Sequence, residues 1–221
     1  DMGDGNITML TDGKRSQNGG IVWNTKGDRV AYASTKRNGA DRDIYMMDPL
    51  NPSTEKLIFE AKGGGFGMND WAPDDNSVII GEGISVNESR LWLIDLKTGT
   101  QKRLSPETKE QAVFGGAVYL PDGKSIYLTT DMDNEFKYLS KMDIATGKMK
   151  AITKSIPWDI SSYDLSKDGT KMIFSTNEAG LSKVYLLNTV TDTYELMKEI
   201  PDGLIGGFAF HNNGEDVVFN Y

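Results

Sequence analysis

Two carboxylates, an amide and a guanidinium stand close together near the middle of the chain, at Glu82, Asn87, Glu88 and Arg90. Residues 83–89 are expected to be the loop that carries or adjoins these side chains. Two carboxylates beside an extended loop could hold the positively charged amino terminus of a peptide. The alternative is a charge-balanced hairpin in which Glu88 and Arg90 pair across the turn.

Two other acidic features invite a functional interpretation. Asp70 and Asp164 occupy the same place in a repeated pattern, where they either make a central channel acidic or bond backbone groups between neighbouring sheets. Residues 131–135 resemble the start of a calcium-binding loop, but Phe136 and Met142 replace the glycine and the glutamate that such a loop requires. A solvated loop is therefore the favoured interpretation of residues 131–135.

The residue types needed for catalysis or for a metal site are scarce. The chain has no cysteine and one histidine, His211, so we expect neither a thiolate zinc site nor a His-rich metal site, and no cofactor. A serine nucleophile elbow needs the pattern Gly-x-Ser-x-Gly. The nearest match, residues 83–87, lacks the second glycine. We therefore expect no catalytic residue in this chain.

Composition excludes some classes of partner. The 221 residues are 38% hydrophobic and 25% charged, with 24 glycines, which is typical of a turn-rich globular protein. The formal net charge of −8 argues against broad nucleic-acid binding, and the apolar runs are too short for membrane insertion. Lys36, Arg37 and Arg42 could meet an acidic partner, but a basic surface loop is usually just solvated.

The elements that position these residues follow a repeat of 45 to 48 residues. An apolar anchor, a turn and a short apolar strand recur at Trp23, Trp71, Tyr119, Leu165 and Phe210. A small residue four positions before each anchor and an apolar residue seven positions after it keep the same period. This register predicts that the aromatic anchors are buried between neighbouring sheets.

Each repeat is predicted to form four short strands, near residues 67–72, 77–82, 90–95 and 100–104 in the second unit. Four-stranded units arranged radially around an axis form an all-β protein, a β-propeller of antiparallel blades. A β-sandwich would not explain a period kept over five copies. Residues 1–221 are then one propeller region, an internal piece of a larger propeller. The predicted blades span residues 18–60, 66–105, 114–154 and 160–200, with partial blades at residues 1–12 and 206–221.

The repeat also resembles a known group of proteins. The pattern resembles the propeller repeats shared by TolB-like periplasmic proteins and the prolyl oligopeptidase family of serine peptidases. Its features are, in order, an aromatic, Pro-Asp-Gly, an apolar strand, Asp-Ile-Tyr, an Asp and Thr-Gly. The resemblance covers the whole chain. Longer stretches that favour the peptidases are residues 33–39, 81–89, 156–159 and 164–169.

In that family, the resemblance implies, a non-catalytic propeller sits over an α/β-hydrolase domain that carries Ser, Asp and His. No such catalytic position occurs in this chain, so the expected partners are a hydrolase domain of the same parent chain and a peptide substrate. Acidic propeller residues hold peptide amino termini in some relatives, which favours that role for Glu82 and Glu88. The resemblance also implies a periplasmic or secreted location. The alternative is a TolB-like scaffold that binds a protein and has no enzymatic activity.

Overall fold

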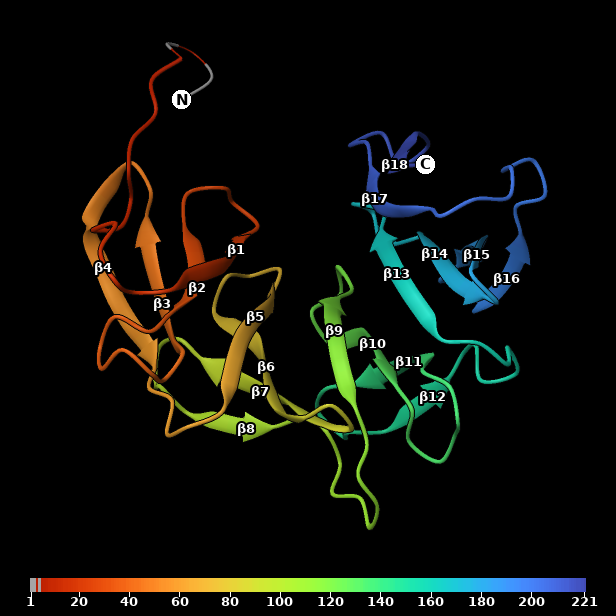
Figure 1. The fold of residues 1–221 in the computed structure, drawn as a ribbon, viewed down its shortest axis with the longest axis horizontal. Coiled ribbons are helices and arrows are strands. Elements are labelled where there is room, and N and C mark those ends of the chain that lie inside the picture. The colour runs from red at the N-terminus through yellow and green to blue at the C-terminus, as the bar shows by residue number, and fades with distance from the viewer. Residues whose placement is uncertain (1–2, 4) are drawn as a thin grey trace. The chain divides into compact units, whose positions relative to one another are not determined.

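The protein is built from β-strands in two compact units, Asp1–Ser105 and Pro106–Tyr221, in a computed structural model that describes residue 3 and residues 5–221 (Figure 1). The described strands form four four-stranded antiparallel sheets and one two-stranded sheet. In each four-stranded sheet the strands follow one another in chain order. This confirms the all-β fold that the repeat predicted.

The first unit contains two sheets, called here the first and the second sheet. Their strands are β1 (Asn18–Trp23), β2 (Val30–Ser34), β3 (Asp43–Asp48) and β4 (Asn51–Phe59), then β5 (Gly65–Trp71), β6 (Ser77–Ser85), β7 (Glu88–Asp95) and β8 (Gln101–Arg103). The two sheets pack through one apolar cluster. Met46 and Ile44 enter it from the first sheet, and Trp71, Ile80 and Ile94 enter it from the second.

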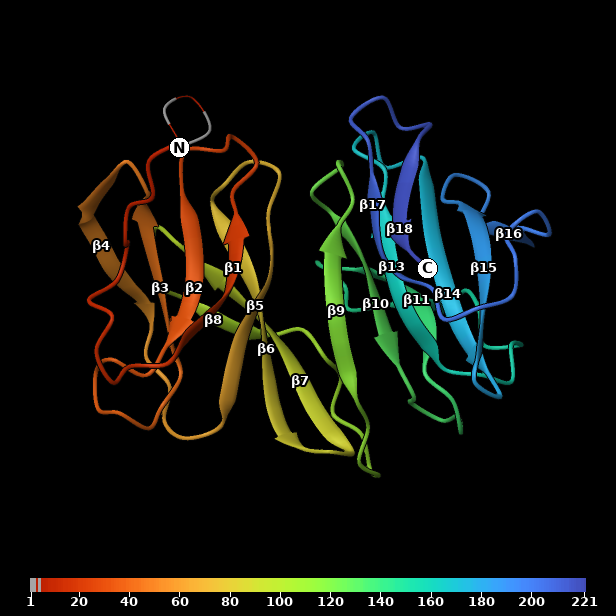
Figure 2. The ribbon, with the colours of Figure 1, turned by 45° about the horizontal axis from the view of Figure 1, so that its top comes forward.

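The second unit contains the third and the fourth sheet and a two-stranded sheet. Their strands are β9 (Phe114–Tyr119), β10 (Ser125–Thr130), β11 (Tyr138–Asp143) and β12 (Met149–Ala151), then β13 (Ile160–Leu165), β14 (Lys171–Glu178), β15 (Leu181–Asn188) and β16 (Thr193–Leu196), and finally β17 (Gly206–Phe210) and β18 (Val217–Asn220). One face of the fourth sheet packs against the third sheet, and its other face packs against β17 and β18 (Figure 2).

Every first strand carries an irregularity in its pairing with the second strand of its sheet. In β1, β9 and β17 a glycine within the irregular stretch has positive φ, namely Gly20 (64°), Gly116 (61°) and Gly207 (64°). Positive φ costs glycine little, which explains the glycine that directly follows the recurring small residue in these three strands. The irregularity lies two to four residues before the anchor in every repeat.

Two expectations about the first blade need correction. The fourth strand expected within residues 1–12 is not formed in the part of this stretch that the structure describes, and residues 1, 2 and 4 lie outside it. Leu10 nevertheless packs on Tyr32 and Tyr45 of the first sheet. Trp23 is 55% exposed, whereas Trp71 at the same register position is 2% exposed. The Trp71 ring is covered because a preceding sheet is present, and the described chain has no sheet before β1.

The predicted loop at residues 83–89 is also wrong in extent. β6 continues through Gly83 to Ser85, and β7 begins at Glu88 with Ser85 as its partner. Only Val86 and Asn87 form the turn. Main-chain pairing therefore overrides the weak strand propensity of the glycines. None of the described residues belongs to an apolar helix of bilayer-crossing length.

Candidate functional site

The candidate site lies on the hairpin formed by β6 and β7. Val78, Ile79 and Ile80 anchor β6 in the interior, each with no exposed surface. Beyond Ile80 the hairpin continues toward solvent and ends in the turn at Val86, which is 92% exposed. A buried base and an exposed tip hold the polar side chains of this hairpin in a fixed place near the surface.

Glu82 is the best-positioned carboxylate of the site. It faces Arg90 across the hairpin and Phe66 on β5. The indole Nε1 of Trp92 donates a hydrogen bond of 2.8 Å to Glu82 Oε2. The indole thus orients the carboxylate, whose two oxygens have the capacity to accept further hydrogen bonds.

Glu88 and Arg90 form an ion pair, with Arg90 Nη2 donating to Glu88 Oε1 at 2.7 Å. The predicted pairing across the turn is wrong in one respect, because both residues lie on β7, two positions apart on one face. Arg90 Nε is buried and has no hydrogen-bond partner in the described chain. Asn87 is exposed in the turn, where its backbone N–H donates to Ser85 Oγ at 3.2 Å.

These side chains share a face of the second sheet. Glu82 and Arg90 are directly opposed, and Glu88, Arg90 and Trp92 alternate along β7. Phe66 lies opposite Glu82 and belongs to the apolar cluster between the first and second sheets. The charged group therefore caps one end of that cluster, where apolar surface and carboxylates adjoin. Such a place suits a ligand with an ammonium group and an apolar side chain.

The connector between β4 and β5 lies against this group and is fixed by Asp43. Asp43 has a fully buried side chain, and its Oδ1 accepts the backbone N–H of Ala61 at 2.8 Å. Arg37 donates to Asp43 at 2.7 and 3.0 Å and to the Ala61 carbonyl at 2.8 Å. A Cβ on Gly64 would lie 3.9 Å from Glu82 Cγ. Arg37 thus has a structural role, because it joins Asp43 to the connector at Ala61.

Of the two other basic residues considered above, Lys36 is likewise engaged, whereas Arg42 Nε is buried and has no hydrogen-bond partner among the described residues. Lys36 pairs with Glu55, and its Nζ lies 3.9 Å from the centroid of the Tyr45 ring. Asp41 accepts hydrogen bonds from Asn38 and Arg37, and the Asn38 amide is the main cause that lowers the pKa of Asp41. For Lys36 and Arg37, these contacts favour internal pairing over a site for an acidic partner.

The two acidic residues of the first strands have different surroundings. Asp164 on β13 accepts the backbone N–H of Phe210 on β17 at 2.7 Å, so it bonds backbone between neighbouring sheets. Asp70 on β5 accepts the N–H of Trp71 at 2.8 Å. Asp164 therefore has the contact expected of the backbone-bonding alternative.

One acid of the loop at residues 131–135 is engaged in another contact. Asp131 Oδ1 accepts the backbone N–H of Val113 at 2.7 Å. The loop borders a cavity of about 690 Å³ together with residues 107–112. Among residues 3 and 5–221, no three acidic or histidine side chains converge closely enough to hold a metal ion.

Trp92 is the site residue that sequence reasoning missed. Its place two residues after Arg90 puts it on the Glu88 and Arg90 face of a strand, which the alternation along residues 88–95 signals. The hydrogen bond to Glu82 could not be read from the sequence, because the assumed loop at residues 83–89 hid the register of the hairpin.

The sheets and their meander order define a β-propeller that resembles those of TolB and of prolyl oligopeptidase-type peptidases. A prolyl endopeptidase structure matches 92% of this chain with a TM-score of 0.65 and 12% identity. TolB from Acinetobacter baumannii matches 82% with a TM-score of 0.63 and 20% identity. The chain covers 38% and 43% of those two chains.

In sequence, the chain is distantly related to dipeptidyl-peptidase 5 of Porphyromonas gingivalis. The two are 27% identical over an alignment of 142 residues, and the alignment covers 60% of this chain and 20% of that protein. No family model matches the chain. The chain thus spans about a fifth of the length of this curated relative.

Proposed function

We propose that this propeller is the non-catalytic part of a prolyl oligopeptidase-type serine peptidase, and that it restricts and positions peptide substrates. The observation that carries the proposal is Glu82, a carboxylate oriented by Trp92 beside the Glu88 and Arg90 pair. The sequence relative is named a dipeptidyl-peptidase, and a structural match is a prolyl endopeptidase. Both names denote enzymes that act on peptides.

In this proposal the amino terminus of a peptide binds at Glu82. The ammonium group donates to Glu82 Oε1, while Arg90 holds Glu88 in place as a second carboxylate. A charge-assisted hydrogen bond at a partly desolvated carboxylate is stronger than one between neutral groups. Fixing one end of the peptide lowers the entropic cost of placing its scissile bond.

The chemical step belongs to a partner in this proposal, an α/β-hydrolase domain of the same parent chain. Acyl transfer there needs an activated serine and a histidine base. This chain has a single histidine, His211, in the turn between β17 and β18. A fluorophosphonate probe tests this division of labour. Covalent labelling of the 221-residue chain would show that it holds a serine nucleophile of its own.

The peptide-binding role is tested by calorimetric titration with a tetrapeptide that has a free amino terminus. We expect saturable binding that weakens at least tenfold when the peptide is N-acetylated or when Glu82→Gln is introduced. Glu199→Gln, at an exposed position of the other unit, is the matched control and should bind as wild type. Equal affinity for the free and acetylated peptides would refute the proposal.

A second candidate is a TolB-like scaffold that binds a folded protein and has no enzymatic partner. The fold likeness to TolB, at a TM-score of 0.63, favours it as the alternative. The same titration separates the two functions, because a scaffold for a folded protein has no reason to discriminate a free from an acetylated peptide amine.

A further inference from the structure

The cross-strand pair of Glu82 and Arg90 departs from the repeat to which it belongs. Its third-strand member lies five residues before the end of the strand, as in each other four-stranded sheet. The corresponding pairs of the first, third and fourth sheets are Ser34 with Asp43, Thr130 with Tyr138 and Thr176 with Lys183. In those three pairs the second-strand residue carries a hydroxyl group and has no exposed surface. Only the second sheet, among these four, has a glutamate at this position and a cation directly opposite. The packing of a blade therefore does not require this pair of charges.

The side chain of Arg90 has two carboxylates as neighbours. Directly opposed residues of antiparallel strands have Cβ atoms about 4.5 to 5.5 Å apart, which makes Glu82 a neighbour by register. The guanidinium nevertheless turns to Glu88, which Nη2 bonds at 2.7 Å. In this arrangement Nε is buried and has no hydrogen-bond partner in the described chain. A buried donor without a partner is unfavourable, so the arrangement seen here does not satisfy all the donors of Arg90.

The surroundings of Glu82 leave room for a cation. The carboxylate is partly exposed, and the Trp92 indole fixes it through Oε2 at 2.8 Å. A Cβ on Gly64 would lie 3.9 Å from Glu82 Cγ and 3.2 Å from the Phe66 ring, so the glycine keeps this place free of a side chain. The guanidinium of Arg90 and the ammonium group of a peptide are both charged donors suited to this carboxylate. Because two cations at one carboxylate repel each other, binding of one opposes binding of the other.

We propose that Arg90 regulates the Glu82 site as a competing cation, and that Glu88 keeps the site open by holding Arg90. While Glu88 binds the guanidinium, Glu82 accepts the ammonium group of a peptide. When Arg90 turns to Glu82, it closes the site. A peptide that binds only the open arrangement shifts the population toward that arrangement. This inference rests on the proposed amino-terminus site and gives Glu88 a second role there.

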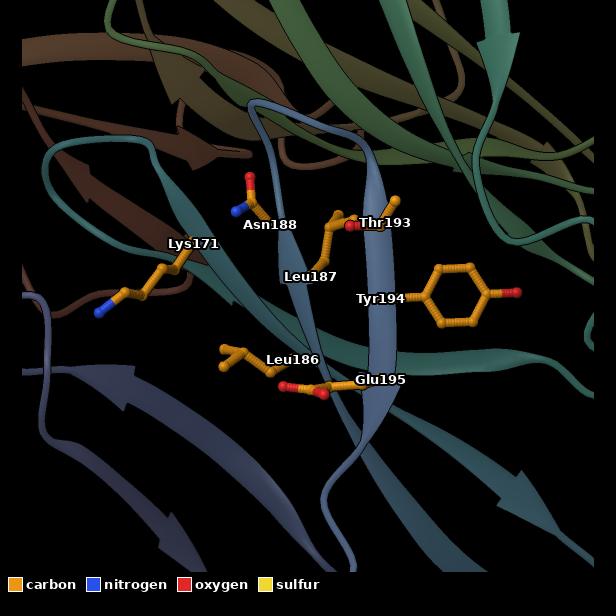
Figure 3. A pocket seen from close by; sticks show the side chains of 7 residues that line it. All are labelled: Lys171, Leu186, Leu187, Asn188, Thr193, Tyr194 and Glu195. Carbon is orange, nitrogen blue, oxygen red and sulfur yellow. The ribbon is translucent and has the colours of Figure 1, made fainter.

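The first test follows the indole N–H resonance of Trp92 in the peptide-free 221-residue chain. This resonance reports on Glu82, because the two groups share a hydrogen bond. Glu88→Gln keeps a neutral acceptor but removes the charge that holds Arg90, so we expect the resonance to move. Adding Arg90→Met should return it to the wild-type position. Glu195→Gln is the matched control and should leave the resonance in place, because this exposed carboxylate lies on β16 in the other unit, beside the cavity of Figure 3.

The second test is a titration of the same variants with the free-amine tetrapeptide. We expect Glu88→Gln to weaken binding at least tenfold, because Arg90 then competes for Glu82. The further change Arg90→Met should strengthen binding at least threefold relative to Glu88→Gln alone. If Glu88 acted only as a second carboxylate, its loss would not move the indole resonance in the peptide-free chain.

Three results would overturn the inference. They are an indole resonance that Glu88→Gln does not move, a moved resonance that Arg90→Met does not restore, and a double variant that binds no better than Glu88→Gln alone. A wild-type chain that does not bind the tetrapeptide would refute the amino-terminus site itself. The indole resonance separates the two failures, because it detects the turn of Arg90 to Glu82 without any peptide.

Discussion

The turn between β5 and β6 is held against the first sheet by one buried carboxylate, that of Asp75. Mutation of Asp75 therefore tests how much this contact contributes to the free energy of unfolding. Asp75 is 4% exposed, accepts the Asn24 amide and the Thr25 backbone N–H at 2.9 Å each, and lies 3.8 Å from Arg29. Asp75→Asn keeps one acceptor oxygen but turns an amide donor toward Asn24 or Thr25. One charge-assisted hydrogen bond is lost and a buried donor loses its partner, which costs about 2 to 3 kcal/mol of unfolding free energy.

Asp75→Ala removes both acceptors and adds a second cost. Asp75 has φ of 59°, a region that disfavours alanine by about 1 to 2 kcal/mol. We expect a total loss of about 4 to 5 kcal/mol. Asp74→Ala in the same turn is the control, because Asp74 is exposed and its bonds to Asn76, at 3.0 Å, are local to the turn. Its expected cost is below about 1 kcal/mol.

Urea unfolding followed by tryptophan fluorescence measures these differences. Three of the four tryptophans lie in the first unit, so the signal reports mainly on the unit that holds Asp75. The two compact units can unfold in separate transitions, and the midpoint of the first unit is then the quantity to compare. The reasoning would be refuted if Asp75→Asn cost no more than Asp74→Ala.

The other predictions concern the connector, the turns and the anchors. Arg37→Ala leaves the buried Asp43 carboxylate without its cation and should cost about 3 to 5 kcal/mol in urea unfolding, and a cost below about 1 kcal/mol would contradict the pairing. Backbone and side-chain donors from Thr170 and Ser166 hold the pKa of Asp168 at about 2, below the unfolded value of about 3.9. Its contribution to stability is therefore complete above about pH 4 and is lost as the pH falls toward 2, so the stability difference between wild type and Asp168→Ala should shrink over that range. A difference independent of pH from 6 to 2 would contradict that pKa. Among the anchors, Trp71→Phe loses the Nε1 bond to the Val22 carbonyl and should cost about 1 kcal/mol or more, whereas Trp23→Phe should be nearly neutral, and equal costs would contradict the difference in burial.

Much of the fold follows from the repeat, because residues at the same position in each repeat unit pack in the same way. Val78 is fully buried on a second strand, as its position seven residues after an anchor predicts, and Trp71 lies between sheets. Trp23 breaks the pattern because burial depends on a neighbouring sheet and not on the residue alone. The repeated aromatic position predicts which residues can be buried between sheets. Whether such a residue is buried depends on the presence of a neighbouring sheet.

The candidate site was less predictable because its geometry depends on pairing register. Residues 83–89 contain glycine, serine and asparagine, which favour a turn, yet pairing of Gly83 with both Gly65 and Ser89 continues the strands. The Trp92 to Glu82 bond follows from that register. Arg37 and Asp43 both bond the backbone of Ala61, which lies 18 residues beyond Asp43 in the chain. No local sequence pattern signals this contact.

The measurement that tests the central claim most directly is a backbone amide shift map of the 221-residue chain during titration with a free-amine tetrapeptide. If the propeller positions peptides by their amino terminus, the largest shifts lie on β6 and β7, around Glu82, Arg90 and the Trp92 indole. These shifts should disappear with Glu82→Gln or with the acetylated peptide. Shifts confined to β18 and the fourth sheet, or no shifts on the β6 and β7 hairpin at saturating peptide, would contradict the account.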